Sequence, residues 1–417
     1  MYNLAIYLYA FVVALLSPFH RKARLMRLGQ RETYSILRKR VDRSSKYIWF
    51  HAASLGEFEQ GRPMIEKIRS EYPAYKVLLT FFSPSGYEIR KNYKGADIVC
   101  YLPFDTPSRV RKFLDLVHPV IAIFIKYEFW SNYLHELKRR DIPVYIISAI
   151  FRPEQLFFQW YGKSYRKVLS CFCHLFVQDE SSRRLLEKYG ITNVTVTGDT
   201  RFDRVLDVRS QAKELPLVER FLMRENGEKP IVLVAGSSWP PDEAIFIPYF
   251  HAHPEMKLIV APHEIHEEHL RAIESTLKRS FVRLSKATER ELASKDCLII
   301  DSFGFLSSIY RYGQIAYIGG GFGVGIHNTL EAAVYGIPVI FGPNYQRFKE
   351  ARDLIAVGGG FSVLDKQAFC EKMDELLSSP ETLAASGKAA GDFVKGNAGA
   401  TELVLSHLKA IECILKQ

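Results

Sequence analysis

The chain has 417 residues, of which 47% are hydrophobic and 24% are charged, so it is long enough for two or three globular domains and is not a disordered protein. Its net charge of +10 is concentrated, because residues 21–46 hold ten basic residues against Glu32 and Asp42 and so carry +8 of that total. The remaining chain is nearly neutral, and no nucleic-acid partner is expected. Six scattered cysteines are too few for a disulfide framework and indicate a reducing compartment.

The first predicted element is an apolar run at residues 4–19. Residues 1–20 hold no formally charged side chain. The 16 residues of this run are slightly fewer than the roughly 17 to 25 that span a bilayer as a helix. A cleavable signal peptide carries its cations before the apolar run, whereas here they follow it. We therefore expect residues 1–20 to be a membrane anchor and residues 21–45 to be a basic juxtamembrane segment on the cytoplasmic face of the membrane. A buried core helix is the alternative.

From residue 46 onwards, short β-branched or aromatic runs alternate with amphipathic stretches, a pattern typical of parallel sheets covered by helices. The strands predicted for a first sheet are 46–53, 76–82, 97–104, 120–126, 144–150, 174–179 and 194–199. Those predicted for a second sheet are 230–238, 257–264, 297–301, 315–321, 338–343 and 361–364, followed by helices over the last 50 residues. The predicted fold class is α/β, with two Rossmann-like doubly wound domains at residues 46–208 and 229–417, a linker at 209–228, and a cleft between the domains.

A glycine-rich segment follows one strand of the second sheet. Gly319, Gly320 and Gly321 precede a helix predicted to open near His327, with Glu331 in about its first turn. Glycines permit close approach of the backbone to a ligand, and a helix N-terminus supplies N–H groups for a phosphate. The spacing matches neither GxGxxG nor GxxxxGK[ST], and no Asp-X-Asp motif occurs. No cofactor and no metal ion are expected, and the grouping of Cys171, Cys173 and His174 is interpreted as core packing.

Seven motifs then occur in a recognisable order. They are SLGE (54–57), TFFSPSGYE (80–88), YLPFDTP (101–107), EFWSN (128–132), GDTRFD (198–203), AGSSW (235–239) and HNTLEAA (327–333). With these motifs the chain resembles the 3-deoxy-D-manno-octulosonic acid (Kdo) transferases of lipopolysaccharide assembly, from its apolar segment to its last helices. The resemblance implies a GT-B-type, inverting and metal-independent enzyme at the cytoplasmic side of the cell inner membrane. Its donor CMP-Kdo is held mainly by the C-terminal domain, and its acceptor, a lipid A precursor, mainly by the N-terminal domain.

The resemblance also implies roles for individual residues. Glu57 falls on the proposed general base and Glu128 on a second acidic position of the active site. The implied donor-binding residues are Gly236, Ser237, Ser238, Pro262, His263, Gly320, Gly321, Asn328 and Glu331. The implied acceptor-binding residues are Ser54, Gly56, Ser83, Ser85, Gly86 and Arg152. One departure from the family is His263, which stands where an arginine is common.

The residue types suit this chemistry. A sugar hydroxyl is a poor nucleophile near pH 7, so its transfer needs a carboxylate or imidazole to take the proton. Glu57 is expected to begin a helix whose dipole keeps the carboxylate ionised. The structural alternatives are a helix-start residue that only complements the dipole for Glu57 and a carboxylate paired with Lys126 for Glu128. Two other functions stay open, a GT-B enzyme such as a nucleotide-sugar epimerase and a hinged two-domain sugar-binding protein.

Overall fold

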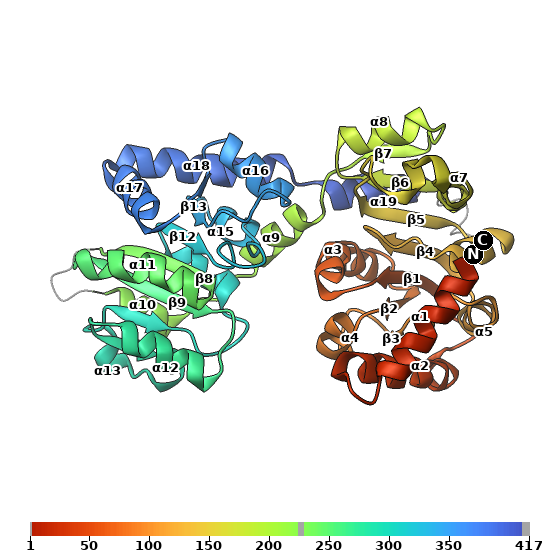
Figure 1. Cartoon of the computed structure of the whole chain (residues 1–417), viewed down its shortest axis with the longest axis horizontal. Helices are drawn as coiled ribbons and strands as arrows, with labels where there is room; N and C mark the ends of the chain where they lie inside the picture. Colours follow the sequence, from red (N-terminus) through yellow and green to blue (C-terminus); the bar gives the residue numbers. More distant parts are fainter. Residues whose placement is uncertain (1, 224–228, 411–417) are drawn as a thin grey trace. The chain divides into compact units, whose positions relative to one another are not determined.

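The computed structural model describes residues 2–223 and 229–410, so residues 224–228 of the predicted linker lie outside the described residues. The chain divides into two compact units, one comprising residues up to Arg204 together with those from Ala398 onwards, and the other Val205–Asn397. Each unit is built on a seven-stranded sheet with helices on both faces (Figure 1). All the strand pairs in both sheets are parallel, which confirms the predicted α/β architecture with two parallel sheets.

The first sheet has the strand order β3-β2-β1-β4-β5-β6-β7. Its strands are β1 Lys46–Ala52, β2 Tyr75–Phe81, β3 Ile98–Tyr101, β4 Pro119–Ile125, β5 Val144–Ala149, β6 His174–Val177 and β7 Val194–Val196. The helices of this part of the chain are α1 Tyr2–Leu16, α2 Arg21–Arg40, α3 Leu55–Glu71, α4 Pro84–Arg90, α5 Pro107–Val117, α6 Ser131–Arg139, α7 Lys163–Arg166, α8 Glu180–Lys188, α9 Arg201–Ser210 and α19 Ala400–Ala410, with short 3-10 helices at Leu156–Phe158, Trp160–Gly162 and Lys167–Cys171.

The core of the first unit lies on both faces of this sheet. Because successive side chains of a strand point to opposite faces, Trp49 packs with α5 and α6 on one side, and its neighbour Phe50 packs with α3 on the other. A parallel sheet buried on both faces needs the near-continuous apolar strands that the sequence shows. The strand ends that carry polar residues are therefore the places where function can be expected.

The last helix returns to the first unit, whereas the sequence analysis placed all residues after 229 in the second domain. Asp203 accepts hydrogen bonds from the backbone N–H groups of Gly399 (2.5 Å) and Thr401 (2.7 Å), which caps the start of α19. Leu405 is buried in the same cluster as Met64 of α3. Figure 1 shows this blue helix within the unit that is coloured red to yellow. An amphipathic pattern predicts a covered helix but not which sheet covers it.

The second sheet has the strand order β10-β11-β9-β8-β12-β13-β14. Its strands are β8 Ile231–Ser238, β9 Met256–Pro262, β10 Phe281–Arg283, β11 Cys297–Ile299, β12 Ile315–Ile318, β13 Val339–Phe341 and β14 Gly360–Ser362. The helices are α10 Pro216–Leu222, α11 Pro240–Ala252, α12 Glu267–Thr276, α13 Glu289–Leu292, α14 Leu306–Ile309, α15 Leu330–Ala333, α16 Lys349–Ala356, α17 Lys366–Leu377 and α18 Pro380–Gly396, with 3-10 helices at Leu284–Lys286 and Tyr310–Tyr312. The sequence analysis missed β10, a three-residue strand at the sheet edge.

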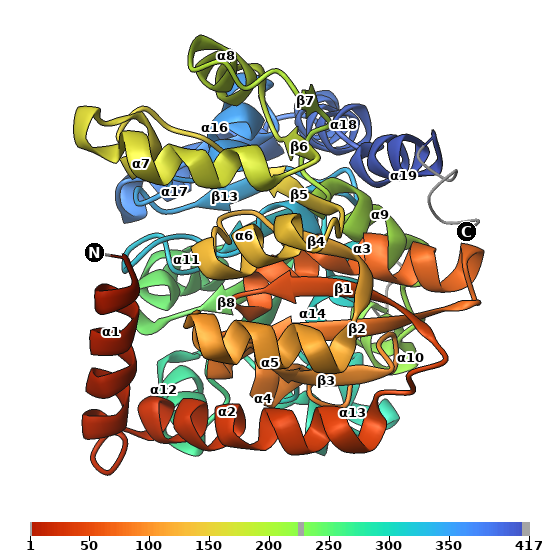
Figure 2. The ribbon, with the colours of Figure 1, turned by 90° about the vertical axis from the view of Figure 1, so that its right-hand side faces the viewer.

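The N-terminal helices form an angle with each other. Helix α2 lies along β3. Helix α1 precedes α2 in the chain, and the chain bends by 116° between the two helices (Figure 2). Within the described residues, no helix taken alone combines the length and apolarity needed to cross a bilayer, and only the bent pair α1 and α2 meets both requirements together. The membrane-anchor role of residues 1–20 stays a prediction.

Candidate active site

The strand order of the first sheet identifies where a site can form. In a doubly wound sheet, ligands bind beyond the carboxyl ends of the strands, at the point where the strand order reverses. Here that point lies between β1 and β4, which are adjacent strands in the order 3-2-1-4. Ser54 follows β1, Gly56 and Glu57 lie in the first turn of the helix α3 that begins there, and the loop after β4 carries Glu128. The two predicted catalytic carboxylates are thus brought to one end of the first sheet.

Glu57 lies in the first turn of α3, whose N-cap residue is Ser54. Its Oε2 accepts a hydrogen bond of 2.6 Å from the backbone N–H of Ala53, so the side chain curls back toward the end of β1. Burial and the nearby Glu128 carboxylate raise the pKa of Glu57 to about 7, although Lys126 and the backbone hydrogen bonds act in the opposite direction. The expectation that the helix dipole alone keeps Glu57 ionised is therefore wrong.

A pKa near 7 suits a general base better than the usual carboxylate value does. A base works best when its pKa lies near the working pH, since it is then both available and strong enough to take a proton. Burial is the larger cause of this shift, because it disfavours the charged form of Glu57, and the nearby negative charge of Glu128 adds to it. The capping bond to Ala53 gives Glu57 a structural role as well, and the two roles are compatible.

Glu128 is held by a buried network that the sequence analysis did not predict. Its Oε2 lies 2.9 Å from Nε2 of His51 and accepts a hydrogen bond of 2.6 Å from the indole N–H of Trp130. On the other side of the imidazole, Nδ1 lies 2.9 Å from the hydroxyl of Thr80, which itself accepts the indole N–H of Trp49 at 2.8 Å. His51 and Thr80 are fully buried, and Glu128 is 7% exposed.

Both ring nitrogens of His51 are engaged in this network. Nδ1 contacts the hydroxyl and the carbonyl oxygen of Thr80 at 2.9 and 3.2 Å, and Nε2 contacts the Glu128 carboxylate and also lies 3.1 Å from the indole N–H of Trp130. The imidazole thus fixes the orientation of Glu128 from within the sheet. In the sequence, the only signal for this network was a polar residue inside each of two apolar strands, His51 and Thr80.

The backbone adopts a left-handed conformation at the ends of three strands. Lys126 after β4, Ser148 in β5 and Ser237 in β8 have φ values of 63°, 52° and 54°. For residues other than glycine this conformation costs about 1 to 3 kcal/mol and persists only where the surroundings impose it. Such strain is concentrated at functional sites, and two of these residues flank predicted site positions.

Among the predicted acceptor-binding residues, four lie close together, namely Ser54, Gly56, Ser83 and Ser85, whereas Gly86 has a packing role. The loops after β1 and β2 are tied together because Ser83 N–H donates to the carbonyl oxygen of Ala53 at 2.7 Å, which brings Ser83 and Ser85 close to Ser54 and Gly56. Gly56 has open space around it. By contrast, a Cβ atom on Gly86 would lie 2.2 Å from a ring carbon of Phe81, so packing explains this glycine.

Arg152 lies in the loop after β5 and is exposed. Its positive charge acts together with that of Arg201 to lower the pKa of Tyr127, although burial of the phenol raises that pKa overall. Glu57 influences the same phenol. Arg152 and the predicted base thus both lie close enough to Tyr127 to influence its pKa.

In the second unit the corresponding reversal of strand order lies between β8 and β12. Asp242 of α11 connects the loops after these strands, because its carboxylate accepts hydrogen bonds from the backbone N–H groups of Trp239 (2.9 Å) and Gly320 (2.8 Å) and from the Tyr317 hydroxyl (3.0 Å). Asp242 is 1% exposed, and burial raises its pKa. The sequence analysis missed it, although an acidic residue three positions after a helix N-cap is a recognisable capping signal.

The predicted glycines allow these loops to pack closely. Gly320 has a φ of 89°, which few other residues adopt. A Cβ atom on Gly321 would lie 2.5 Å from the backbone nitrogen of Gly342, and one on Gly236 would lie 1.9 Å from the hydroxyl of Tyr310. These three positions, predicted to bind the donor, therefore also have a packing reason to be glycine.

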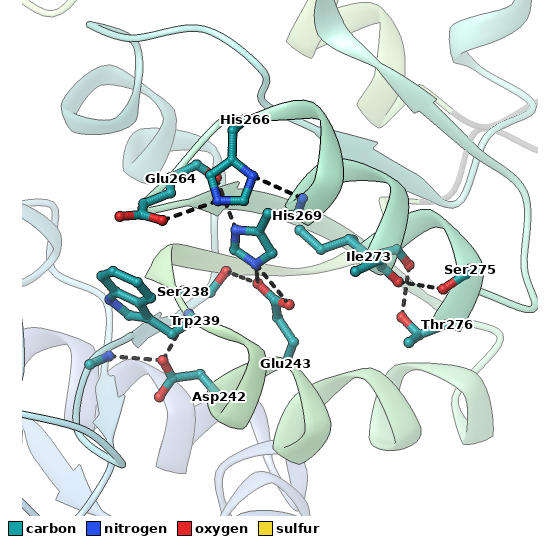
Figure 3. A network of polar contacts seen from close by, with 12 residues as sticks. Ser238, Trp239, Asp242, Glu243, Glu264, His266, His269, Ile273, Ser275 and Thr276 are labelled. Atoms are coloured by element: carbon teal, nitrogen blue, oxygen red, sulfur yellow. Dashed lines mark hydrogen bonds and ion pairs between the residues drawn. The ribbon is translucent and has the colours of Figure 1, made fainter.

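Ser238 is buried, and its side chain is engaged within the protein. Its hydroxyl donates to Glu243 at 2.9 Å, and the same carboxylate oxygen lies 3.0 Å from Nε2 of His269 (Figure 3). The other ring nitrogen of His269 lies 2.9 Å from the carbonyl oxygen of Glu264. Ser238 thus anchors the end of β8, whereas Ser237 beside it is only partly buried.

Three stacked rings lie next to the glycine loop. His263, which follows Pro262 at the end of β9, lies between Trp239 and His327, with ring centroids 4.8 and 4.3 Å away. Burial and the adjacent His263 lower the pKa of His327 to about 4, so its imidazole is neutral at pH 7. The stack therefore presents ring faces and edges to a ligand, not the guanidinium charge that an arginine would supply at position 263.

Asn328 and Glu331, both predicted to contact the donor, lie in contact with each other. The side-chain N–H of Asn328 donates to Oε1 of Glu331 at 3.1 Å, and its carbonyl oxygen accepts the backbone N–H of Leu330. The helix expected to open near His327 begins instead at Leu330 and has four residues. Among the described residues, no group of three His, Cys, Asp or Glu side chains is placed to hold a metal ion.

The pKa of Glu57 leads to a prediction about stability. Since the folded-state pKa of about 7 exceeds the usual value of 4.5, the folded protein binds more protons than the unfolded chain between these values, and stability falls as pH rises through this window. Glu57→Gln removes the charge and keeps an acceptor for Ala53. We expect its melting temperature to exceed that of the wild type by roughly 2 to 4 °C at pH 8, equivalent to about 1 kcal/mol, and to match it near pH 5. Thermal unfolding of both proteins at pH 5 and pH 8 tests this. The prediction is contradicted if the melting temperature of the variant minus that of the wild type is lower at pH 8 than at pH 5.

Comparison with known proteins extends these observations. Residues 24–204 match the family model described as 3-Deoxy-D-manno-octulosonic-acid transferase (kdotransferase). The chain is 27% identical over 376 residues to the 3-deoxy-D-manno-octulosonic acid transferase of Haemophilus influenzae, covering 87% of this chain and 86% of that protein. It is also 27% identical over 352 residues to the enzyme of the same name from Aquifex aeolicus, covering 82% and 89%.

Among solved structures, the UDP-GlcNAc 2-epimerase from Neisseria meningitidis bound to UDP-GlcNAc matches with a TM-score of 0.62. The match covers 87% of this chain and 100% of that one at 16% sequence identity. At this level of identity the likeness establishes a shared fold of two parallel sheets and nothing about the reaction. The sequence matches therefore bear on the family of the chain, whereas the structural match bears on its fold alone.

Proposed function

Because the chain is a homologue of the 3-deoxy-D-manno-octulosonic acid transferases over most of its length, we propose that it is an inverting glycosyltransferase that moves Kdo from CMP-Kdo to a lipid A precursor. The observation that carries this function is sequence similarity at 27% identity across more than four fifths of the chain and of the relatives. A nucleotide-sugar epimerase is not favoured, since the likeness to such enzymes is one of fold at 16% identity.

The geometry of the first unit supports a division of roles between the two carboxylates. Glu57, with a pKa of about 7, takes the proton of the attacking acceptor hydroxyl. Glu128, fixed by His51 and Trp130, raises the basicity of Glu57 and is in turn available to hydrogen-bond the acceptor. The open backbone at Gly56 and the hydroxyls of Ser83 and Ser85 lie beside them and provide acceptor contacts.

The second unit supplies the groups for the donor. The loops after β8 and β12 are joined through Asp242, and the partly buried Ser237 at the end of β8 is positioned to contact the phosphate of CMP. Glu331, positioned by Asn328, accepts the ribose hydroxyls. CMP is a good leaving group, and fixed dipoles of this kind can stabilise its charge as the glycosidic bond forms.

One assay tests the whole assignment. The purified full-length protein is incubated with CMP-Kdo and a lipid A precursor, and release of CMP is followed with and without the acceptor. Acceptor-dependent release together with a Kdo-containing lipid is the expected result. Hydrolysis of CMP-Kdo that does not depend on the acceptor, or epimerisation of UDP-GlcNAc under the same conditions, would contradict it.

We also propose that the protein works on the cytoplasmic side of the inner membrane, attached through α1 and the basic residues of α2. In support, α1 makes specific contacts with the first unit through Tyr2, whose hydroxyl donates to Asp105 at 2.5 Å, and through Tyr9, which packs on Phe82 and Phe104. Most of its larger apolar side chains are exposed, Phe11 by 64% and others at Leu4, Tyr7, Leu8, Val12, Leu15 and Leu16. A helix held in place with its apolar side uncovered favours a lipid surface.

Removing this apolar surface is expected to weaken membrane attachment. Full-length protein should sediment with membranes, and the combined variant Leu4→Gln, Leu8→Gln, Phe11→Gln and Leu15→Gln should move largely to the soluble fraction. High salt should release still more of the variant, since its remaining attachment through basic residues is screened. Deleting residues 1–20 should act in the same direction. Sedimentation of membranes at low and high salt measures the effect, and wild-type protein found wholly in the soluble fraction at low salt would refute the proposal.

A further inference from the structure

A pocket of about 380 Å³ lies in the first unit, between α1, α2 and the segment that joins β3 to α5. Three arginines contribute to its lining, Arg27 and Arg31 from α2 and Arg109 from α5, and none of its lining residues is acidic. The remaining lining includes Gln30, Phe104 and small apolar residues of α1 such as Val13. Figure 2 shows α1 at the end of α2 and α5 beside α2, all in red to orange.

Gln30 is the most informative residue of this pocket. It is 5% exposed, and its side-chain oxygen accepts the backbone N–H of Phe104 at 3.1 Å. This bond fixes which end of the amide is oxygen, because a flipped amide would place two donors against each other. The amide nitrogen is buried and has no hydrogen-bond partner in the described part of the chain. Since buried donors are nearly always satisfied, its lack of a partner indicates a ligand with acceptor oxygens.

The three arginines of the pocket add positive charge beside the unused N–H donors of Gln30. Arg27 donates to the Ser17 hydroxyl at 2.7 Å and to the carbonyl oxygen of Ala14, which joins α2 to the end of α1. Arg31 and Arg109 are exposed at the entrance. Within residues 2–223 and 229–410, none of the three forms an ion pair with a carboxylate. A pocket with four donor side chains and no acidic one suits an anion with several oxygens, such as a phosphate.

The apolar wall shows what the anion is attached to. Val13 and Phe104 belong to one apolar cluster with Met26, and the helix α1 that carries Val13 also carries exposed apolar side chains such as Leu4 and Phe11. A free phosphate would leave this wall in contact with water, whereas a lipid covers it with its acyl chains. We propose that this pocket binds the phosphate headgroup of a membrane phospholipid, with the acyl chains lying along α1. The inference goes beyond Kdo transfer and does not depend on it.

The position of the pocket gives such binding a consequence for the active site. Phe104 contacts Phe82 with ring centroids 6.1 Å apart, and Phe82 packs on Trp130 at 4.4 Å. Trp130 donates to Glu128. The headgroup pocket and the second carboxylate are thus connected through three packed aromatic rings of one unit, so a bound headgroup lies against the same group of side chains that holds Glu128.

Calorimetry with a short-chain phosphatidylglycerol, used below the concentration at which it forms micelles, tests the proposal on the purified full-length protein. Gln30→Glu keeps the acceptor for Phe104 and replaces the unused N–H donors by a negative charge. We expect it to weaken binding by about 10-fold or more, and Arg31→Gln by a similar factor, because each removes a charge-assisted contact to the phosphate. Inorganic phosphate should bind at least about 10-fold more weakly than the lipid, since it buries no apolar surface.

Arg38→Gln is the matched control. Arg38 lies on α2 two turns after Arg31, is exposed, and is outside the pocket, so this substitution removes the same charge and should change binding by less than about 2-fold. Equal losses for Arg31→Gln and Arg38→Gln would show diffuse attraction and overturn the proposal. Equal binding of inorganic phosphate and lipid would overturn it too. A third outcome would also overturn the proposal: Gln30→Glu binds phosphatidylglycerol as the wild type does but has a raised KM for the acceptor. That result would assign the pocket to the acceptor. Thermal unfolding at the wild-type temperature shows that each variant is folded.

Discussion

Glu57→Gln is expected to lower the turnover of Kdo transfer by about 10²-fold or more, the usual contribution of a general base. Glutamine keeps the size of the side chain and an acceptor for the Ala53 N–H, but it cannot take a proton from the acceptor hydroxyl. Affinity for CMP should stay the same, since the donor residues belong to the other unit. The rate of CMP release at saturating substrates measures the effect.

The pH dependence separates loss of a base from other damage. In the wild type, kcat/KM should rise with pH and level off above about 7, because burial and Glu128 raise the pKa of Glu57 to that value and only the ionised form is active. The residual activity of Glu57→Gln should lack this inflection. If the inflection persists, or if the variant keeps near-normal turnover, the base is another group, and Glu128 is the next candidate.

Glu59→Gln is the control for this experiment. Glu59 lies two residues further along α3, and its carboxylate pairs with Arg90 at 2.7 Å and Arg204 at 3.3 Å instead of facing Glu128. Its loss should reduce thermal stability slightly and leave turnover within a few-fold of wild type, because partly exposed ion pairs contribute only about 0 to 1 kcal/mol. An equal loss of turnover in both variants would mean that α3 as a whole, and not the Glu57 carboxylate, had been disturbed.

Glu331→Ala is expected to weaken the binding of CMP by about 1 to 3 kcal/mol, or roughly 5- to 150-fold in the dissociation constant. The reason is that two ribose hydroxyls lose a charged acceptor, which Asn328 holds in position at 3.1 Å. Calorimetry with CMP measures this directly. An unchanged dissociation constant would remove Glu331 from the ribose site.

His263→Ala serves as the comparison in the same experiment. His263 is stacked between Trp239 and His327, so its removal should loosen the stack without removing a cation from the donor site. We expect a smaller loss of CMP affinity than for Glu331→Ala. A larger loss would mean that the imidazole contacts the phosphate directly and carries a proton when CMP binds.

Local patterns in the sequence were sufficient to predict the α/β class of fold and a resemblance to one enzyme family. Alternating apolar and amphipathic stretches predicted both parallel sheets, because strand and helix periodicities are local properties of the chain. Seven short motifs carried the resemblance to a known family and selected Glu57, Glu128, Ser237 and Glu331 as candidate site residues. These motifs are also local, and each keeps its meaning without knowledge of what lies beside it in space.

The contacts between distant residues and the surroundings of each carboxylate followed from the tertiary structure and not from local sequence patterns. The contact of His51 with Glu128 joins residues 77 positions apart, and it follows from the pairing of β1 with β4. Asp242 reaches Gly320 through the neighbouring strands β8 and β12, and α19 covers the first sheet. The raised pKa of Glu57 has the same origin, since burial and a second carboxylate are created by strand order and packing, neither of which local periodicity encodes.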